Sequence, residues 1–244
     1  MPNTSYEIRV CESCGLRYPL VAEHPFGVRC PACTGNTRAI LRRELITEPD
    51  SDLLPKTKNS RSLLKETKRK TEGHTNWAVL LDNIRSAWNA GSILRSADGF
   101  GFTHAYFCGI TPTADHEAVT KTSLGAEDSV PWSYHKDAVK LVKGLKKEAG
   151  KVYALEEDTK AIALESGSSL APPARAGVLP PHRRQTVGFQ ILIVGNEVTG
   201  VDPELLDLCE AIFYIPMRGE KKSFNVAIAF GIAAYVLSIQ KLGT

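Results

Sequence analysis

The sequence predicts an α/β protein in which helices cover both faces of a mostly parallel sheet, with a small cysteine-rich module in front of it. Three observations lead to this fold class. From about residue 76 onward, short β-rich runs alternate with helical patterns. Polar, glycine-containing clusters follow three of the predicted strands, and four of the six cysteines lie in two CxxC pairs near the start. We therefore expect a cysteine module (1–43), a linker (44–73) and an α/β domain (74–244).

The module at residues 1–43 contains the ligand pattern of a structural zinc site. Its two CxxC pairs are Cys11, Cys14, Cys30 and Cys33. Each pair turns two thiolates toward one ion, and four sulfurs complete a tetrahedron with no open position for catalysis. Disulfide pairing is the alternative, and the absence of a secretory pattern argues against it. Cys108 and Cys209 stand alone, and we expect them to be small buried residues.

The linker at residues 44–73 is predicted to be basic. Its segment Lys56–Lys70 contains seven Lys or Arg residues and one acidic residue, Glu66, although the whole chain has a formal charge of only +3. A solvated helix explains most charge runs of this kind. Six arginines surround the cysteine pairs and favour a nucleic-acid partner. They are Arg9, Arg17, Arg29, Arg38, Arg42 and Arg43.

The domain at residues 74–244 is expected to alternate strands with helices. Strands are predicted at 77–82, 104–109, 151–155, 189–195 and 211–216. Helices are predicted at 89–101, at 136–150, from Asp202 onward and from about Val226 to the C-terminus. Asp202 followed by Pro203 is a good helix start, because it places an N-cap before proline at the first helical position. Strands separated by helices indicate a parallel sheet.

The C-terminal helix is apolar on almost every side, so we expect it to be buried nearly all round. Its apolar residues are Val226, Ile228, Phe230, Ile232, Val236, Leu237 and Ile239. Polar residues stand just before it, and Ser223 can cap it. Capping does not explain Asn225, Glu197 and Asn89 together. Because ligands of parallel sheets bind beyond the carboxyl ends of the strands, we expect these three side chains to meet there.

Three motifs together resemble the SpoU, or TrmH-like, branch of the SPOUT RNA methyltransferases. They are "NAGSILRSADGFG", "LIVGNEVTGVDPEL" and "IPMRGEKKSFNVAIA", and both their order and their spacing match the family. The resemblance covers about Trp77–Tyr235, and the cysteine module lies outside it. It implies S-adenosylmethionine as methyl donor, a ribose 2′-hydroxyl of tRNA or rRNA as acceptor, a homodimer, and a C-terminal trefoil knot.

The resemblance also implies roles for single residues. The implied catalytic residues are Arg95, Asn89, Glu197, Ser223 and Asn225. The implied cofactor-binding residues are Leu155, Gly195, Asn196, Gly200, Ile215, Met217 and Phe224. Phe224 replaces the usual leucine, and Asn196 stands where alanine is common. Arg95 either accepts the hydroxyl proton or clamps an RNA phosphate, because a guanidinium with a pKa above about 12 is a poor base.

Other functions are weighed against this one. A nicotinamide-dependent oxidoreductase is disfavoured because no G-x-G-x-x-G follows the first strand of the domain. A noncatalytic zinc-ribbon RNA-binding protein and a base-methylating SPOUT enzyme are alternatives on the same fold. No apolar run reaches the length of a membrane span, so we expect a cytoplasmic protein with no membrane partner. We also expect the chain to bind S-adenosylmethionine without residues 1–70.

Overall fold

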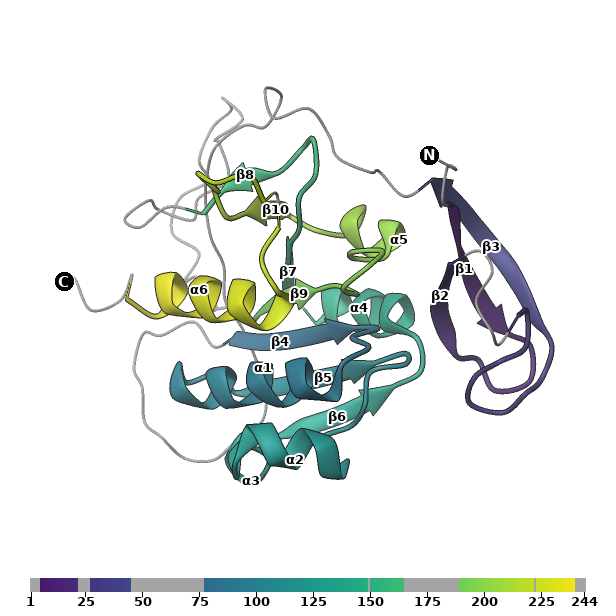
Figure 1. Cartoon of the computed structure of the whole chain (residues 1–244), viewed down its shortest axis with the longest axis horizontal. Helices are drawn as coiled ribbons and strands as arrows, with labels where there is room; N and C mark the ends of the chain where they lie inside the picture. The colour runs from purple at the N-terminus through teal and green to yellow at the C-terminus, as the bar shows by residue number, and fades with distance from the viewer. Residues whose placement is uncertain are drawn as a thin grey trace.

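The computed structural model of the chain describes residues 5–21, 27–44, 77–148, 150–164, 189–221 and 223–239. Within these ranges the protein has a small antiparallel sheet and a larger α/β part (Figure 1). Apart from residue 44, the linker predicted at 44–73 lies outside the described residues, as does the insertion at 165–188. The division into three parts stays a prediction.

The small sheet is built by the cysteine module. Its strands are β1 (Ser5–Cys11), β2 (Arg17–Val21) and β3 (Thr37–Glu44). They lie in the order β2-β1-β3, and both pairings are antiparallel. The register shifts between Ile8 and Arg9, so that both of these neighbouring side chains are buried. One edge of the module lies against the larger part of the protein (Figure 1).

The larger sheet has seven strands, and every pairing in it is parallel. The strands are β4 (Trp77–Asp82), β5 (His104–Cys108), β6 (Trp132–His135), β7 (Lys151–Leu155), β8 (Ile162–Ala163), β9 (Gln190–Val194) and β10 (Ala211–Tyr214). Their order is β6-β5-β4-β9-β7-β10-β8. The predicted strands are all present, and β6 and β8 are additional short ones.

Helices cover both faces of this sheet, which confirms the predicted fold class. They are α1 (Ala87–Gly99), α2 (Glu117–Ser123), α3 (Ala126–Ser129), α4 (Ala138–Lys147), α5 (Pro203–Leu206) and α6 (Val226–Ile239). α1, α2, α3 and α6 share one apolar core with the sheet, while α4 and α5 pack on the opposite face. The knot stays a prediction. No helix in the described part of the chain is both long and apolar enough to cross a membrane.

Side-chain caps decide where several helices begin. The Ser86 hydroxyl accepts the Asn89 N–H at 3.3 Å and starts α1. The Asp202 carboxylate accepts the Glu204 N–H at 2.9 Å, with Pro203 at the first helical position, so the predicted start of α5 is confirmed. That cap also fixes the direction in which the chain leaves the loop after β9.

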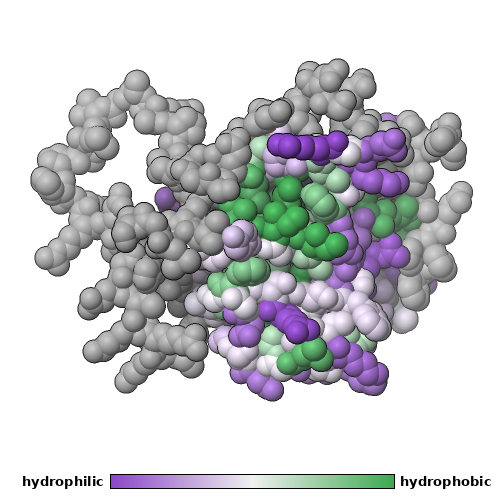
Figure 2. Space-filling view, turned by 60° about the vertical axis from the view of Figure 1, so that its left-hand side comes forward, coloured by the Kyte–Doolittle hydropathy of each residue, from purple (hydrophilic) through white to green (hydrophobic). Residues whose placement is uncertain are grey.

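The expectation that α6 is buried nearly all round is wrong for a single chain. Phe230 and Leu237 are buried in the core, but Ile228 and Tyr235 are 55% and 54% exposed. Figure 2 brings the α6 side of the molecule forward and shows an apolar patch among polar surroundings. The helix therefore has one apolar face in the core and another at the surface.

Candidate functional site

A cavity of about 640 Å³ lies beyond the carboxyl ends of β7, β9 and β10. This volume is typical of pockets that hold a small molecule. Every residue predicted to bind a cofactor lines it: Leu155, Gly195, Asn196, Gly200, Ile215, Met217 and Phe224. Glu197, Ser223 and Asn225 line it as well. The sequence motifs therefore converge on one site.

A tight loop after β9 forms one wall of the cavity. Asn196 and Gly200 exchange backbone hydrogen bonds of 3.0 and 2.9 Å, and Gly200 has φ +69°. A Cβ on Gly195 would lie 2.3 Å from the backbone carbon of Gly200, so only glycine fits there. The Asn196 side chain donates to the Asn83 carbonyl at 2.7 Å and so ties the loop to the end of β4. The loop is held by its own backbone and by the sheet.

Glu197 joins this loop to the start of α1. Its carboxylate accepts the backbone N–H groups of Arg85 and Ser86 at 2.8 and 3.0 Å. It also accepts the Asn89 side-chain amide at 2.8 Å. Burial alone raises the pKa of Glu197, but these hydrogen bonds outweigh burial and the pKa is lowered overall. Glu197 is therefore ionised at neutral pH, and it holds the loop after β9 against the start of α1.

Asn225 continues the contact to the third motif. Its side-chain amide donates to the Asn89 Oδ1 at 3.0 Å, while its own Oδ1 accepts the Ala227 N–H at 2.9 Å and caps α6. The cap considered for Ser223 is thus made by Asn225. Ser223 is exposed and lines the cavity instead. Asn89 lies between Glu197 and Asn225, so one chain of hydrogen bonds links the three motifs.

Arg95 is not brought to this cavity. It lies on α1, six residues after Asn89, on the exposed side of the helix. Six residues correspond to about 9 Å along an α-helix. Arg95 is absent from the cavity lining found in the described part of the chain. Within one chain, the predicted catalytic arginine and the predicted cofactor site are separate.

Other residues of the cavity wall were not predicted. The cysteine module contributes Tyr6, Arg43 and Glu44, and nothing in the sequence signals this contact. Glu156 lies just beyond β7 and accepts the Val201 N–H at 2.8 Å. Burial raises the pKa of Glu156 despite that hydrogen bond. A carboxylate directly after a predicted strand is a signal that sequence reading can use.

The four-cysteine cluster fits a tetrahedral metal ion. The four Sγ atoms lie within 4.8 Å of one another. Two of the Sγ pairs are 3.5 Å apart (Cys11 to Cys33) and 3.7 Å apart (Cys14 to Cys30). Zinc–sulfur bonds of about 2.3 Å in a tetrahedron require sulfurs about 3.8 Å apart. None of the cysteines forms a disulfide, and Cys108 and Cys209 lie outside the cluster.

Together, the parallel sheet, the glycine loop and the cavity at the strand ends define an α/β protein with a pocket of small-molecule size, next to which a carboxylate holds the loop in place. Residues 76–235 match the SpoU rRNA Methylase family. The chain belongs to that family, which confirms the resemblance of its three motifs.

Known relatives share the matched region. The chain is 28% identical over 165 residues to the 23S rRNA (guanosine-2′-O-)-methyltransferase RlmB of Xanthomonas axonopodis pv. citri, covering 68% of this chain and 59% of RlmB. It is 27% identical over 164 residues to the tRNA (guanosine(18)-2′-O)-methyltransferase of Thermus thermophilus, covering 67% of this chain and 75% of that enzyme. The chain thus spans 59% of the length of RlmB.

A solved structure has the same fold. The SpoU methyltransferase AviRb of Streptomyces viridochromogenes, in complex with AdoMet, superposes with a TM-score of 0.55 at 21% identity. The match covers 69% of this chain and 62% of AviRb. It supports the fold of the larger part of the chain.

Proposed function

We propose that the chain is an S-adenosylmethionine-dependent RNA methyltransferase that methylates a ribose 2′-hydroxyl in tRNA or rRNA. Its family and the names of its relatives support this reaction class. The observation that carries the proposal is the hydrogen-bond chain from Glu197 through Asn89 to Asn225 at the cavity. A chain whose site had decayed would have no reason to keep these three groups in contact.

The cavity fits the proposed donor in size and in wall chemistry. Its volume suits a nucleoside-sized ligand, and Gly195 lets the backbone at 200–201 close tightly into one wall of the cavity. Backbone groups at Gly195, Ile215 and Phe224 would hold the adenosine. The donor supplies an electrophilic methyl group on a sulfonium. The protein's task is to align the acceptor oxygen with that methyl group, and such positioning is worth about 7 to 11 kcal/mol.

Glu197 acts in this scheme by holding other groups in place. Its lowered pKa and its three hydrogen-bond donors make it a poor proton acceptor. It instead fixes the Asn89 side chain, which in turn orients Asn225. Asn225 lines the cavity together with Ser223, and an RNA sugar would be bound beside them. Ser223 is the exposed hydroxyl of this group.

Arg95 acts on the acceptor, either as the group that takes the hydroxyl proton or as a clamp on a neighbouring phosphate. Arg95→Ala should lower kcat by about a hundredfold or more under both versions while donor affinity stays unchanged, because Arg95 acts on the acceptor and is absent from the donor pocket lining of its own chain. Arg95→Lys separates them, since a phosphate clamp retains part of its effect with any cation. Lys147→Ala, an exposed cation on α4, is the control. Full activity in Arg95→Ala would contradict both versions.

A second copy of the chain would bring Arg95 to the cavity of its partner. The exposed apolar residues of α1 and α6 support such a homodimer. Trp88 on α1 is 66% exposed, and α6, which exposes Ile228 and Tyr235, shares one core with α1 on the same side of the sheet. Exposed apolar area of this kind is typical of interaction surfaces. Ile228→Asp should give a monomer in sedimentation equilibrium and lose activity. A fully active monomer would contradict the shared site.

RNA would also contact the cysteine module, held together by a zinc ion on its four thiolates. Exposed arginines line this module: Arg29, Arg38, Arg42 and Arg43. Arg9 and Arg17, by contrast, are buried and cannot contact phosphates. Each phosphate contact contributes about −0.7 to the slope of log affinity against log salt for single strands. Arg38→Ala should therefore weaken RNA binding and flatten that slope, as measured by filter binding at several salt concentrations.

The proposed function is tested by comparing ribose-methylation maps of RNA from cells with and without the gene. One 2′-O-methyl group in tRNA or rRNA should disappear. Loss of a base methyl group instead would identify a base-methylating enzyme. Identical maps, with RNA binding intact, would identify a noncatalytic RNA-binding protein. Calorimetric titration of the purified chain with S-adenosylmethionine should show binding in the first two cases.

A further inference from the structure

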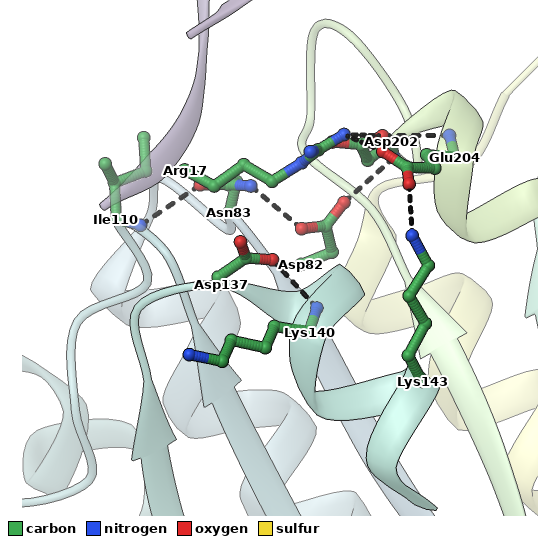
Figure 3. A network of polar contacts seen from close by, with 9 residues as sticks. All are labelled: Arg17, Asp82, Asn83, Ile110, Asp137, Lys140, Lys143, Asp202 and Glu204. Atoms are coloured by element: carbon green, nitrogen blue, oxygen red, sulfur yellow. Dashed lines mark hydrogen bonds and ion pairs between the residues drawn. The ribbon is translucent and has the colours of Figure 1, made fainter. Parts of the chain in front are cut away.

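The cysteine module is attached to the α/β part by a buried arginine. Arg17 begins β2, and its side chain is 8% exposed. Its Nε donates to Asp202 Oδ2 at 2.7 Å, and a terminal nitrogen donates to Asp202 Oδ1 at 3.0 Å. The same nitrogen lies 3.1 Å from Glu204 Oε2. Figure 3 shows the guanidinium reaching both carboxylates. This bidentate contact joins Arg17 to Asp202, which are 185 positions apart in the sequence.

A second buried carboxylate lies behind the first. The Asp202 backbone N–H donates to Asp82 Oδ2 at 2.9 Å, and the Asn83 side chain donates to Asp82 Oδ1 at 2.8 Å. Both aspartates are nearly inaccessible to water. Burial and the charge of Asp202 raise the pKa of Asp82 to about 7, although hydrogen bonds and Arg17 act in the opposite direction. The guanidinium of Arg17 is the cation that faces this pair in Figure 3.

Asp202 stands at the end of the loop that walls the cavity. The loop runs from Gly195 to Val201, and Val201 is held by Glu156 on the cavity side. Asp202 also caps α5, whose Pro203 lines the cavity. The loop and the first turn of α5 therefore share one anchor. Whatever fixes Asp202 fixes the far end of this wall.

The cysteine cluster is part of the same contact. Arg17 donates its backbone N–H to the Lys136 carbonyl at 2.9 Å, just beyond β6. Ile110, in the turn after β5, packs on the apolar group formed by Cys11, Leu16, Tyr18 and Cys30. Cys11 and Cys30 of the four-cysteine cluster thus belong to the apolar group that Ile110 contacts. The cluster is three residues from Arg17 in the sequence, since Cys14 precedes it closely.

We propose that the cysteine module is a structural part of the donor pocket, and that Arg17 is the residue through which the module positions the loop at 195–202. The inference rests on the proposed function for the identity of the donor. Arg17 is a positioning residue, because it contacts the loop and does not line the cavity. Occupation of the four-cysteine site by zinc then tunes affinity for S-adenosylmethionine.

This proposal reverses the expectation that the chain binds the donor without residues 1–70. Removing the module takes away Arg17, which leaves Asp202 and Asp82 next to each other without the guanidinium that binds Asp202. Two neighbouring carboxylates that have lost their bound cation repel one another and draw in water, even though their backbone and Asn83 hydrogen bonds remain. The loop end then moves away from its position in the cavity wall. Tyr6 and Arg43 are lost from the wall at the same time.

The test is calorimetric titration of the full, zinc-loaded chain with S-adenosylmethionine. Arg17→Ala should weaken donor binding about tenfold or more. Arg17→Lys keeps the charge but cannot form the fork, so its affinity should be intermediate. Lys140→Ala removes an exposed cation beside the same network and should bind like the wild type (Figure 3). Wild-type affinity in a folded Arg17→Ala variant with full zinc content overturns the proposal.

A second variant keeps the test decisive if Arg17→Ala does not fold. Asp202→Asn preserves side-chain volume and the cap of α5 while removing the charge that the fork binds. It should also weaken donor binding, and unchanged affinity would contradict the role of the fork. Chelating the zinc from the full chain should weaken donor binding in the wild type more than in Arg17→Ala. Equal affinity of the metal-free and zinc-loaded wild type would overturn the link to the cysteines.

These outcomes are distinct from failure of the proposed function. If the wild type itself binds no S-adenosylmethionine, the proposed reaction fails and this inference fails with it. If the wild type binds the donor and the Arg17 and Asp202 variants bind it equally well, only the positioning role fails.

Discussion

Glu197, in the loop after β9, and Asp82, at the end of β4, are two carboxylates that differ in almost every property. Glu197 is exposed, accepts three hydrogen bonds and has a lowered pKa. Asp82 is buried behind Asp202, and its pKa is raised to about 7. Glu197 belongs to a motif that can be identified from the sequence, whereas Asp82 is reached through an arginine of another module. Glu197 thus borders the cavity, whereas Asp82 borders the contact between the loop end and the cysteine module.

The largest expected effect on donor affinity comes from the loop at 195–201, which lies between Glu197 at the cavity and Asp82 at the module contact. Gly195→Ala would place a Cβ 2.3 Å from the backbone of Gly200, so the loop must shift. Donor affinity should fall about a hundredfold, which corresponds to about 2.8 kcal/mol. Gly219→Ala is the matched control, because no atom lies within 4 Å of its added Cβ. Calorimetric titration of both variants measures the effect, and equal affinities would mean that this loop does not bind the donor.

The next largest effect on stability and donor affinity is expected from the hydrogen-bond chain of Glu197, Asn89 and Asn225. Glu197→Gln replaces a carboxylate that accepts three hydrogen bonds by an amide with one acceptor oxygen. Stability should fall by about 2 kcal/mol, and donor binding should weaken about tenfold. Because the pKa of Glu197 is lowered from 4.5, its stabilising effect is present above pH 4.5 and lost as pH falls further. Urea unfolding of Glu197→Gln should therefore lack the part of the fall in the free energy of unfolding below pH 4.5 that Glu197 causes in the wild type.

Glu148→Gln, an exposed carboxylate after α4, is the control for that experiment. A Glu197→Gln variant with the stability and donor affinity of this control would remove Glu197 from the site.

At the contact of Arg17, Asp202 and Asp82, the free energy of unfolding should change with pH in the opposite direction. The folded state raises the pKa of Asp82 from 3.8 to about 7 and therefore binds its proton more tightly than the unfolded chain. The free energy of unfolding should then decline as pH rises between those values, by a few kcal/mol at about 1.4 kcal/mol per pKa unit. Asp82→Asn removes this slope. In urea unfolding from pH 4 to pH 8, the free energy of unfolding of Asp82→Asn should rise relative to that of the wild type as pH rises. A difference that stays constant with pH would contradict the raised pKa of Asp82.

The smallest expected effect is at the cavity edge. Phe224 is 40% exposed, so Phe224→Leu removes little buried apolar area. Donor affinity should change by no more than about threefold, which is under 1 kcal/mol. A titration that found a loss above tenfold would indicate that the Phe224 ring packs on the donor.

Short-range patterns predicted much of this molecule. The buried strands and the helix start at Asp202 and Pro203 each depend on a few neighbouring residues. The cofactor residues lie just beyond strand ends, so the parallel fold brings them together once the strands are known.

Long-range contacts explain most of what was missed. Arg17 and Asp202 are 185 residues apart, and no local pattern distinguishes Arg17 from the exposed arginines of the same module. The surface exposure of α6 could not be read from its composition, because an apolar helix is compatible with both a core and an interface. Ser223 and Asn225 are both residue types that cap helices well. In the structure the cap is made by Asn225, whose side-chain oxygen accepts the Ala227 N–H.

The central claim is that the cavity beside Glu197, Asn89 and Asn225 holds a methyl donor for an RNA sugar oxygen. The most direct measurement incubates the purified, zinc-loaded chain with total RNA and S-adenosylmethionine labelled in its methyl group, then digests the RNA to nucleosides. The account predicts label in a 2′-O-methylated nucleoside. Label on a base, or none in RNA at all, would contradict it.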